Sequence, residues 1–100
     1  MIASIRFTAA AEQDLKSAVD YLEDQRRGLG EELRVEIRGT LRRLTEHPEL
    51  YPVALESVRK AIIRRFPFSV FYRVEEKTIW ILAVLHHARR PEILRQRLGP

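Results

Sequence analysis

Apolar residues recur at intervals of three or four over two long stretches in the first half of the chain, which predicts two amphipathic helices. In the first stretch, residues 9 to about 25, the recurring residues are Ala11, Leu15, Ala18, Val19 and Leu22. In the second, residues 30–46, they are Leu33, Ile37, Leu41 and Leu44. The sequence RRGLG at 26–30 separates them, and Gly28 is expected to adopt the left-handed conformation of a helix end. So short a break predicts an antiparallel helix hairpin.

Strand-like segments flank this hairpin on both sides. Residues 2–7 alternate in polarity, which predicts a short first strand, and Thr8 is expected to cap the helix that follows. Later segments rich in Ile, Val, Phe, Tyr and Trp predict three more strands, at residues 58–66, 69–75 and 78–87. The connecting segment HPELYPVALES, residues 47–57, is expected to be a loop.

Pro91 suits the first turn of a short closing helix, residues 91–98. The predicted order is β-α-α-β-β-β-α in a single domain over residues 1–100. We therefore expect an α+β fold, with an N-terminal strand and an antiparallel helix hairpin packed on a mostly antiparallel four-stranded sheet.

The last predicted strand is apolar on both faces, which indicates a central position in the sheet. Strict alternation places one set of side chains, Trp80, Leu82, Val84 and His86, opposite another, Ile81, Ala83, Leu85 and His87. The helix hairpin covers one face. The other face needs a cover as well, from the closing helix, from a partner, or from both.

Charge is distributed unevenly along the chain. Residues 1–58 carry eight Lys/Arg and eleven Asp/Glu, whereas residues 59–100 carry ten and three. Most of the later cations are arginines, whose forked donors match the oxygens of phosphates and carboxylates. A polyanionic or acidic partner is one interpretation, and a solvated basic surface is the other.

Several classes of protein are disfavoured by composition. The chain contains no cysteine, so disulfides and thiolate metal sites are excluded. No stretch approaches the roughly 20 apolar residues that span a bilayer, and the first residues lack the features of a signal peptide. A cytoplasmic protein that does not engage the membrane is expected.

Six stretches, in this order and at this spacing, carry a resemblance to one family: FTAAAEQDL, AVDYLE, LGEEL, HPELYP, RRFPFSVFYRV and ILAVLHHARRP. Together they cover nearly the whole chain, which resembles the toxins of the RelE/ParE superfamily, the toxic halves of bacterial type II toxin–antitoxin pairs. The most specific part is the FPF hairpin followed by AVLHHARRP. The α+β fold that the resemblance implies agrees with the one predicted above.

The ending of the chain is closer to the ParE branch. RelE-like members are ribosome-dependent mRNA endonucleases that often end soon after the last strand with a tyrosine, whereas this chain has Ala88 there and continues into a helix. The resemblance implies a plasmid stabilisation-type toxin that inhibits DNA gyrase, needs no cofactor and is more a binding protein than an enzyme. A cognate antitoxin is implied as partner, through which the complex binds operator DNA. The alternatives are a RelE-like endonuclease, with ribosome and mRNA as partners, and a non-toxic binding module.

The candidate site is the junction where the last strand meets the basic segment HHARRPEILRQR, residues 86–97. As a docking surface for the target its contacts are His86, His87, Arg89, Arg90 and Arg95. If the chain is a nuclease instead, the candidates are His87 as proton donor and a phosphate clamp of Arg59, Arg65, Arg73 and Arg89, with no base assigned. A metal site is not expected, because adjacent strand histidines point to opposite faces and no carboxylate cluster accompanies them.

Some of these side chains have structural alternatives. His86 ends an apolar face and suits a structural role. Arg59 and Arg73 are near Glu56 and Glu75 along the chain, so ion pairs to these carboxylates are expected. Arg89 and Arg90 have no obvious partner in the chain, which favours an external ligand.

Overall fold

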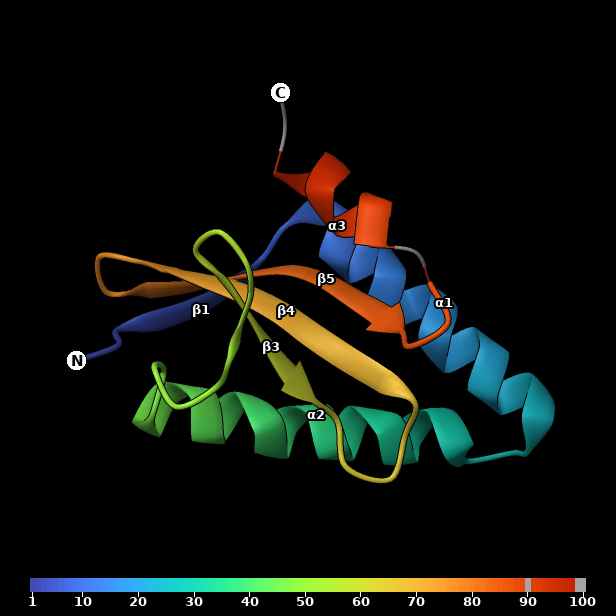
Figure 1. Cartoon of the computed structure of the whole chain (residues 1–100). Coiled ribbons are helices and arrows are strands. Elements are labelled where there is room, and N and C mark those ends of the chain that lie inside the picture. Colours follow the sequence, from blue (N-terminus) through green and yellow to red (C-terminus); the bar gives the residue numbers. More distant parts are fainter. Residues whose placement is uncertain (90, 99–100) are drawn as a thin grey trace.

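A computed structural model describes residues 1–89 and 91–98 of the chain (Figure 1). The elements are β1 (Ser4–Phe7), α1 (Ala9–Gln25), α2 (Leu29–Glu46), β2 (Val53–Leu55), β3 (Val58–Ile62), β4 (Phe68–Glu75), β5 (Thr78–His86) and α3 (Pro91–Arg97). The strands form one sheet in the order β1-β5-β4-β3-β2, in which β1 runs parallel to β5 and the other neighbours are antiparallel. The α+β fold with a helix hairpin on a mostly antiparallel sheet is confirmed, and β5 is central as predicted.

The sheet has five strands, not the four that were predicted. The additional strand, β2, lies within the segment expected to be a loop. It is three residues long, and its register with β3 shifts between Val53 and Leu55. A segment so short and irregular shows no alternation of polarity, so pattern alone does not reveal it.

Local interactions fix the helix hairpin. The Thr8 hydroxyl caps α1 by accepting a hydrogen bond from the Ala11 N–H at 3.1 Å. Gly28 adopts the expected left-handed conformation, with φ of 90°, and stands at the N-cap of α2. The Glu23 carboxylate accepts hydrogen bonds from the Gly28 and Gly30 N–H groups, which have no partner within the helix at the start of α2. These backbone donors lower the pKa of Glu23 below its ordinary value.

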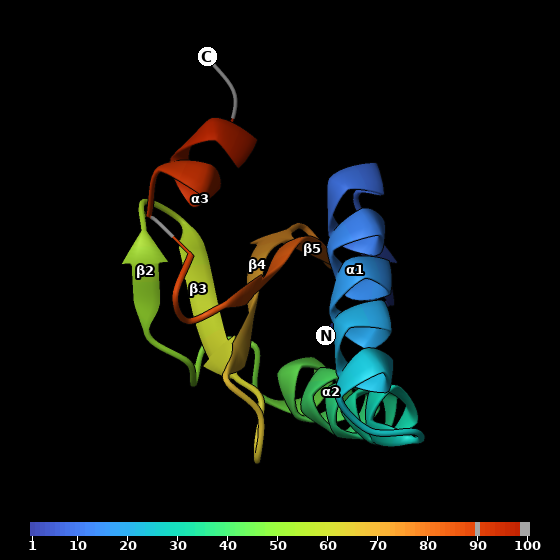
Figure 2. The same ribbon diagram turned by 90° about the vertical axis from the view of Figure 1, so that its right-hand side faces the viewer.

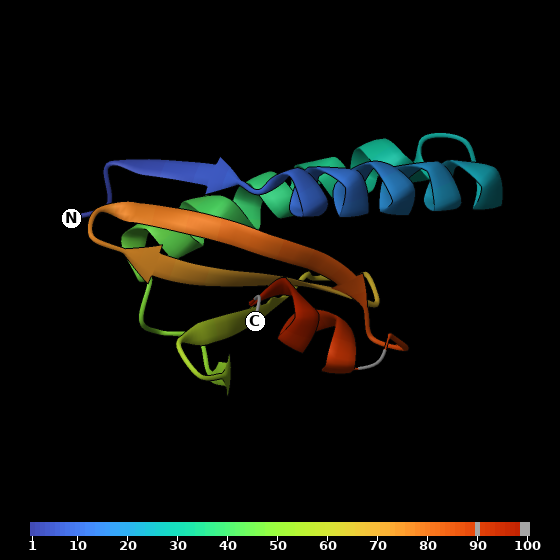
Figure 3. The same ribbon diagram turned by 90° about the horizontal axis from the view of Figure 1, so that it is seen from above.

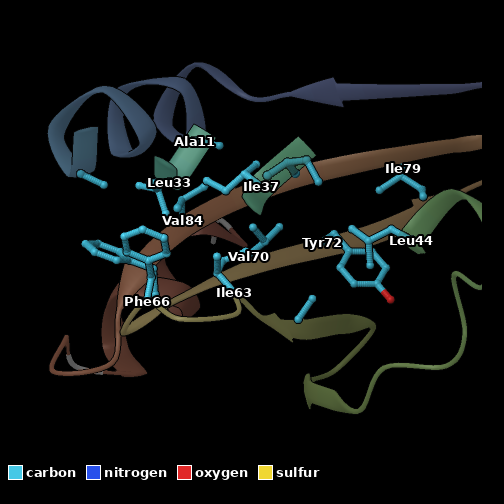
Figure 4. Close-up of a cluster of buried hydrophobic side chains, with 14 of the residues drawn as sticks. Ala11, Leu33, Ile37, Leu44, Ile63, Phe66, Val70, Tyr72, Ile79 and Val84 are labelled. Carbon is cyan, nitrogen blue, oxygen red and sulfur yellow. The ribbon is translucent and has the colours of Figure 1, made fainter. Parts of the chain in front are cut away.

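The main core lies between the helix hairpin and one face of the sheet (Figure 4). Its fully buried side chains come from α1, α2, β3, β4, β5 and the residue that follows β3, and include Leu33, Ile63, Val70, Tyr72 and Ile81. On the opposite face, α3 packs over a smaller cluster (Figure 2). The members of this second cluster are Val58, Leu82, Ala83, Leu85 and Leu94. The second face of the sheet is therefore covered in part by the closing helix of the chain itself.

A β-bulge in β5 overturns the strict alternation predicted for this strand. Phe71 pairs with Ala83 but Tyr72 pairs with Ile81, so Leu82 is an extra residue. Leu82 and Ala83 consequently both belong to the cluster under α3, while Val84 joins Ile81 in the main core. The predicted grouping of Leu82 with Val84, and of Ile81 with Ala83, is wrong for this reason.

No helix in the described part of the chain is long and apolar enough to cross a membrane.

Candidate functional site

The last third of β5 pairs with β4 along one edge, but along its other edge side chains take the place of a neighbouring strand. β1 ends at Phe7, opposite Ile81, and α1 continues beside β5 from there (Figure 3). Past this point the Val84 N–H donates to Asp14 Oδ2 at 3.0 Å, and Arg97 Nη1 donates to the Leu82 carbonyl at 2.8 Å. The backbone groups that the bulge displaces are therefore paired.

The same two side chains form an ion pair that connects α1 with α3. Both Arg97 nitrogens lie 2.8 Å from Asp14 oxygens, and the two side chains are only 21% and 13% exposed. The hydrogen bonds to Asp14 raise the pKa of Arg97 above its ordinary value. We call Asp14, Arg97 and the Leu82 and Val84 backbone groups the bulge clamp. It fixes the end of β5 and the position of α3 together.

The two histidines at the end of β5 make different contacts. His86 Nδ1 accepts a hydrogen bond from the Ala88 N–H at 2.9 Å, and its ring lies edge-on to Phe68 with centroids 5.2 Å apart. His87 Nε2 is 2.9 Å from the hydroxyl of Ser69, which is fully buried. The His87 N–H also donates to the Pro67 carbonyl at 2.8 Å. Both rings are thus oriented by the protein.

A cavity of about 330 Å³ opens between β2, β3, the end of β5 and α3. Its basic lining residues are Lys60, His86, His87, Arg89 and Arg95, and its apolar ones are Ala54, Leu55, Phe71, Leu85 and Leu94. No carboxylate lines it, and among the described residues Lys60, Arg89 and Arg95 form no salt bridge. We call it the cationic pocket. Its arrangement is that of a site for an anionic group attached to an apolar one.

A second hollow, of about 470 Å³, lies on the other side of the same junction. It runs between α1 and the end of β5 and includes Tyr21, Phe68 and Val84, and it shares His86 and Arg89 with the cationic pocket. We call it the helix groove. The Tyr21 side chain in it is half exposed, which leaves an aromatic ring accessible for a partner.

The profile of a family described as "ParE toxin of type II toxin-antitoxin system, parDE" matches residues 5–91 of the chain. The chain belongs to this family. Its fold is similar to a solved chain of the chromosomal ParDE toxin–antitoxin system from P. aeruginosa, with a TM-score of 0.74 and 24% identity over 85% of this chain and 96% of that one. Likeness to a chain of the RelBE2 toxin–antitoxin complex from Mycobacterium tuberculosis is weaker, with a TM-score of 0.49 and 23% identity over 89% and 97% of the two chains. No curated protein sequence matches the chain.

In this ParE-type toxin the predicted docking residues converge. Four of the five, His86, His87, Arg89 and Arg95, line the cationic pocket. The fifth, Arg90, lies outside the described residues. Lys60 was not among the predicted residues, although it completes the pocket. The sequence offers little to single it out, because it lies beside Arg59 in a mixed strand and the register that pairs it with Phe71 is a tertiary feature.

The residues of the nuclease alternative are not brought together. Only His87 and Arg89 of that set line the cationic pocket. Arg59 donates to the Tyr51 carbonyl at 2.6 Å and to the Glu49 carbonyl at 3.2 Å, so it holds a loop. The predicted ion pair with Glu56 is therefore replaced by bonds to these backbone carbonyls.

The two other arginines of that set also have partners elsewhere. Arg65 pairs with Glu32 and Glu36 of α2, at 2.9 and 3.4 Å. Arg73 pairs with Glu75 at 3.4 Å, as predicted. The Arg65 contacts connect a turn to α2, and the Arg73 contact lies within β4. The four arginines of the predicted phosphate clamp therefore do not come together.

The bulge clamp had one recognisable signal in the sequence. Asp14 follows Ala11 by three residues and precedes Ala18 by four, so it shares the buried face of α1. A carboxylate on a buried face requires a partner. That the partner is Arg97 is not predictable from spacing, because 83 positions separate the two.

Proposed function

We propose that this ParE-type toxin inhibits DNA gyrase by binding it through the cationic pocket, so that cleaved DNA stays bound to the enzyme. The observation that carries the proposal is the convergence of His87, Arg89, Arg95 and Lys60 on one pocket without a carboxylate. Such an unneutralised group attracts an acidic protein surface or protein-bound DNA.

Binding explains this arrangement better than catalysis. The His87 ring is engaged with the buried Ser69 hydroxyl, and Arg59, Arg65 and Arg73 serve other parts of the fold. Among residues 1–89 and 91–98 no carboxylate lines the pocket beside His87 to serve as a general base, and the His86 ring is engaged with the Ala88 N–H. An endonuclease needs an acid and a base on opposite sides of the reacting phosphate, so the pocket is better suited to hold an anion than to cleave one.

A supercoiling assay with purified gyrase tests the proposal. The wild-type toxin is expected to inhibit supercoiling and accumulate cleaved DNA, and its expression should induce the DNA-damage response. Arg89→Ala with Arg95→Ala should require at least about tenfold more toxin, equivalent to about 1.4 kcal/mol of binding free energy. The matched control is Arg38→Ala with Arg42→Ala, which removes two exposed cations from α2 and should inhibit like the wild type.

Two results contradict the proposal. Unimpaired supercoiling together with mRNA cut in the ribosomal A site identifies the RelE-like alternative. Harmless overexpression, with neither target affected, identifies the non-toxic binding module.

We also propose a cognate antitoxin that covers the helix groove with an amphipathic helix or an extended segment, and through which the complex binds operator DNA. Membership of a toxin–antitoxin family and the accessible Tyr21 ring beside apolar Phe68 and Val84 support this. Co-expression with the neighbouring open reading frame should rescue growth and yield a complex. In that complex Tyr21→Ala should weaken binding at least about fivefold, as expected for an aromatic anchor. Growth inhibition that the neighbouring gene does not relieve contradicts the proposal.

A further inference from the structure

We propose that the cationic pocket binds one nucleotide unit of single-stranded DNA, with the phosphate at its basic rim and the base on its apolar floor. The proposal rests on the proposed function, since it names the part of a gyrase–DNA target that this pocket contacts. It concerns the chemistry of the ligand: a phosphate ester attached to a planar ring, as opposed to a protein carboxylate.

The rim supplies more positive charge than the fold uses. Lys60 comes from β3, Arg95 from α3, and Arg89 from the turn between β5 and α3. None of the three forms a salt bridge with a carboxylate among residues 1–89 and 91–98. Arginine and lysine arranged around one opening match a phosphate group, which offers several oxygens to donors from different directions.

The floor of the pocket suits a planar ring. Phe71 is partly exposed there, and Leu85 and Leu94, each only 6% exposed, lie among the same lining residues. Lys60 Nζ is 6.0 Å from the centre of the Phe71 ring, at the outer limit of a cation–π contact. An accessible aromatic ring beside basic side chains is the arrangement by which proteins hold single-stranded nucleic acid without reading its sequence.

The size of the pocket distinguishes a nucleotide from an acidic side chain. Its volume of about 330 Å³ is at the lower end of the range for small-molecule sites, about 300–1,000 Å³. A carboxylate from a partner protein would reach the rim and leave the floor uncovered. A nucleotide uses both parts at once, because its base and phosphate are joined through the sugar.

The bulge clamp prepares this pocket in advance. Arg97 is pinned to Asp14 and to the Leu82 carbonyl, so the α3 residues Leu94 and Arg95 are held opposite Lys60 and Phe71. The ligand therefore does not have to order α3 when it binds, which lowers the entropic cost of association.

Fluorescence anisotropy of a labelled ten-residue thymidine oligonucleotide, titrated with the purified full chain, tests the proposal. Arg89→Ala with Arg95→Ala should weaken binding at least about tenfold. It should also reduce the slope of log K against log salt by about 0.7, as for one phosphate of a single strand that is no longer neutralised. Phe71→Leu should weaken binding about fivefold or more through lost stacking, with the salt slope unchanged.

Controls separate this site from general attraction between opposite charges. Arg38→Ala with Arg42→Ala removes the same charge from α2 and should change affinity less than about twofold. Lys60→Gln tests the rim independently should Phe71→Leu prove unstable in thermal unfolding. Thymidine 5′-monophosphate should compete with the oligonucleotide, whereas an octaglutamate peptide should compete poorly.

Three outcomes overturn the proposal: absence of oligonucleotide binding at 0.1 M salt, equal losses in the α2 control, and stronger competition by octaglutamate than by the nucleotide. The gyrase assay keeps the two hypotheses apart. Inhibition of gyrase without oligonucleotide binding removes the nucleotide site and leaves the proposed function. Oligonucleotide binding without inhibition of gyrase removes the proposed function and leaves the nucleotide site.

Discussion

The two faces of the sheet are covered in different ways. The α1–α2 hairpin covers one face with the larger core, which the helix groove reaches only at the end of β5, and charged groups near it, such as Arg65 and Glu32, pair with each other. The seven-residue α3 covers the other face only partly, and beside it remains the cationic pocket with its unneutralised side chains. The first face maintains the fold, and we infer that the second is available for a ligand because less of it is needed for stability.

The largest expected effect separates the two faces directly. Leu33→Ala removes a fully buried side chain from the main core and should lower the free energy of unfolding by about 3–5 kcal/mol. Leu94→Ala, in the cluster beside the pocket, should lower the free energy of unfolding by only about 1–2 kcal/mol, because water from the open pocket can fill the space that the side chain leaves. Urea denaturation of both variants measures the difference. Equal losses would show that the α3 face contributes to stability as much as the main core.

The next effect concerns the bulge clamp, which joins the two faces. Asp14→Ala leaves the Val84 N–H and the Arg97 guanidinium without their partner. Because both side chains retain some exposure, we expect a loss of about 2 kcal/mol, below the 3–5 kcal/mol of a fully buried pair. Limited proteolysis should cut the variant near α3 first.

Asp14→Asn is the matched control for this change. It retains an acceptor for the Val84 N–H but not the ion pair to Arg97, so it should lose less stability than Asp14→Ala. If proteolysis releases α3 no faster in Asp14→Ala than in the wild type, the clamp does not hold this helix.

A smaller effect tests the packing of the helix hairpin that covers the main core. A Cβ on Gly30 would lie 2.7 Å from Val19 Cγ1 and 2.9 Å from the Val19 carbonyl oxygen. Gly30→Ala should therefore cost about 1–3 kcal/mol, as for overpacking. Gly39, in the same helix, has nothing closer than 3.6 Å, and Gly39→Ala should be neutral or stabilising by up to about 1 kcal/mol. Thermal unfolding of the two variants measures this difference. A destabilised Gly39→Ala would contradict the steric explanation.

The difference between the faces also explains what the sequence could predict. The helices and their core residues follow from periodicity, since each buried face repeats over several turns. The proposed docking residues lie within the nearly contiguous stretch 86–95, so a basic run after an apolar strand was enough to group them in the sequence. Lys60 and the pairing of Asp14 with Arg97 depend on strand register and on contacts distant in sequence, and the bulge at Leu82 has no residue signature. The sequence therefore predicts most of the residues that line the candidate site, but not the contacts that hold them in place.

The smallest stability effect concerns the loop that leads from the main core to the pocket wall. The buried Tyr72 hydroxyl donates to the Pro48 carbonyl at 2.6 Å, and this loop continues into β2, which supplies Ala54 and Leu55 to the pocket. Tyr72→Phe should cost about 1 kcal/mol, as for one hydrogen bond.

Burial raises the pKa of Tyr72 from 10.0 to about 12. The folded state therefore retains this proton more strongly than the unfolded state, so its contribution is complete below pH 10 and is lost as the pH rises through about 12. Urea denaturation between pH 9 and pH 12 should show the wild type losing stability more steeply than Tyr72→Phe. Parallel losses in the two proteins would show that another group causes the alkaline decline.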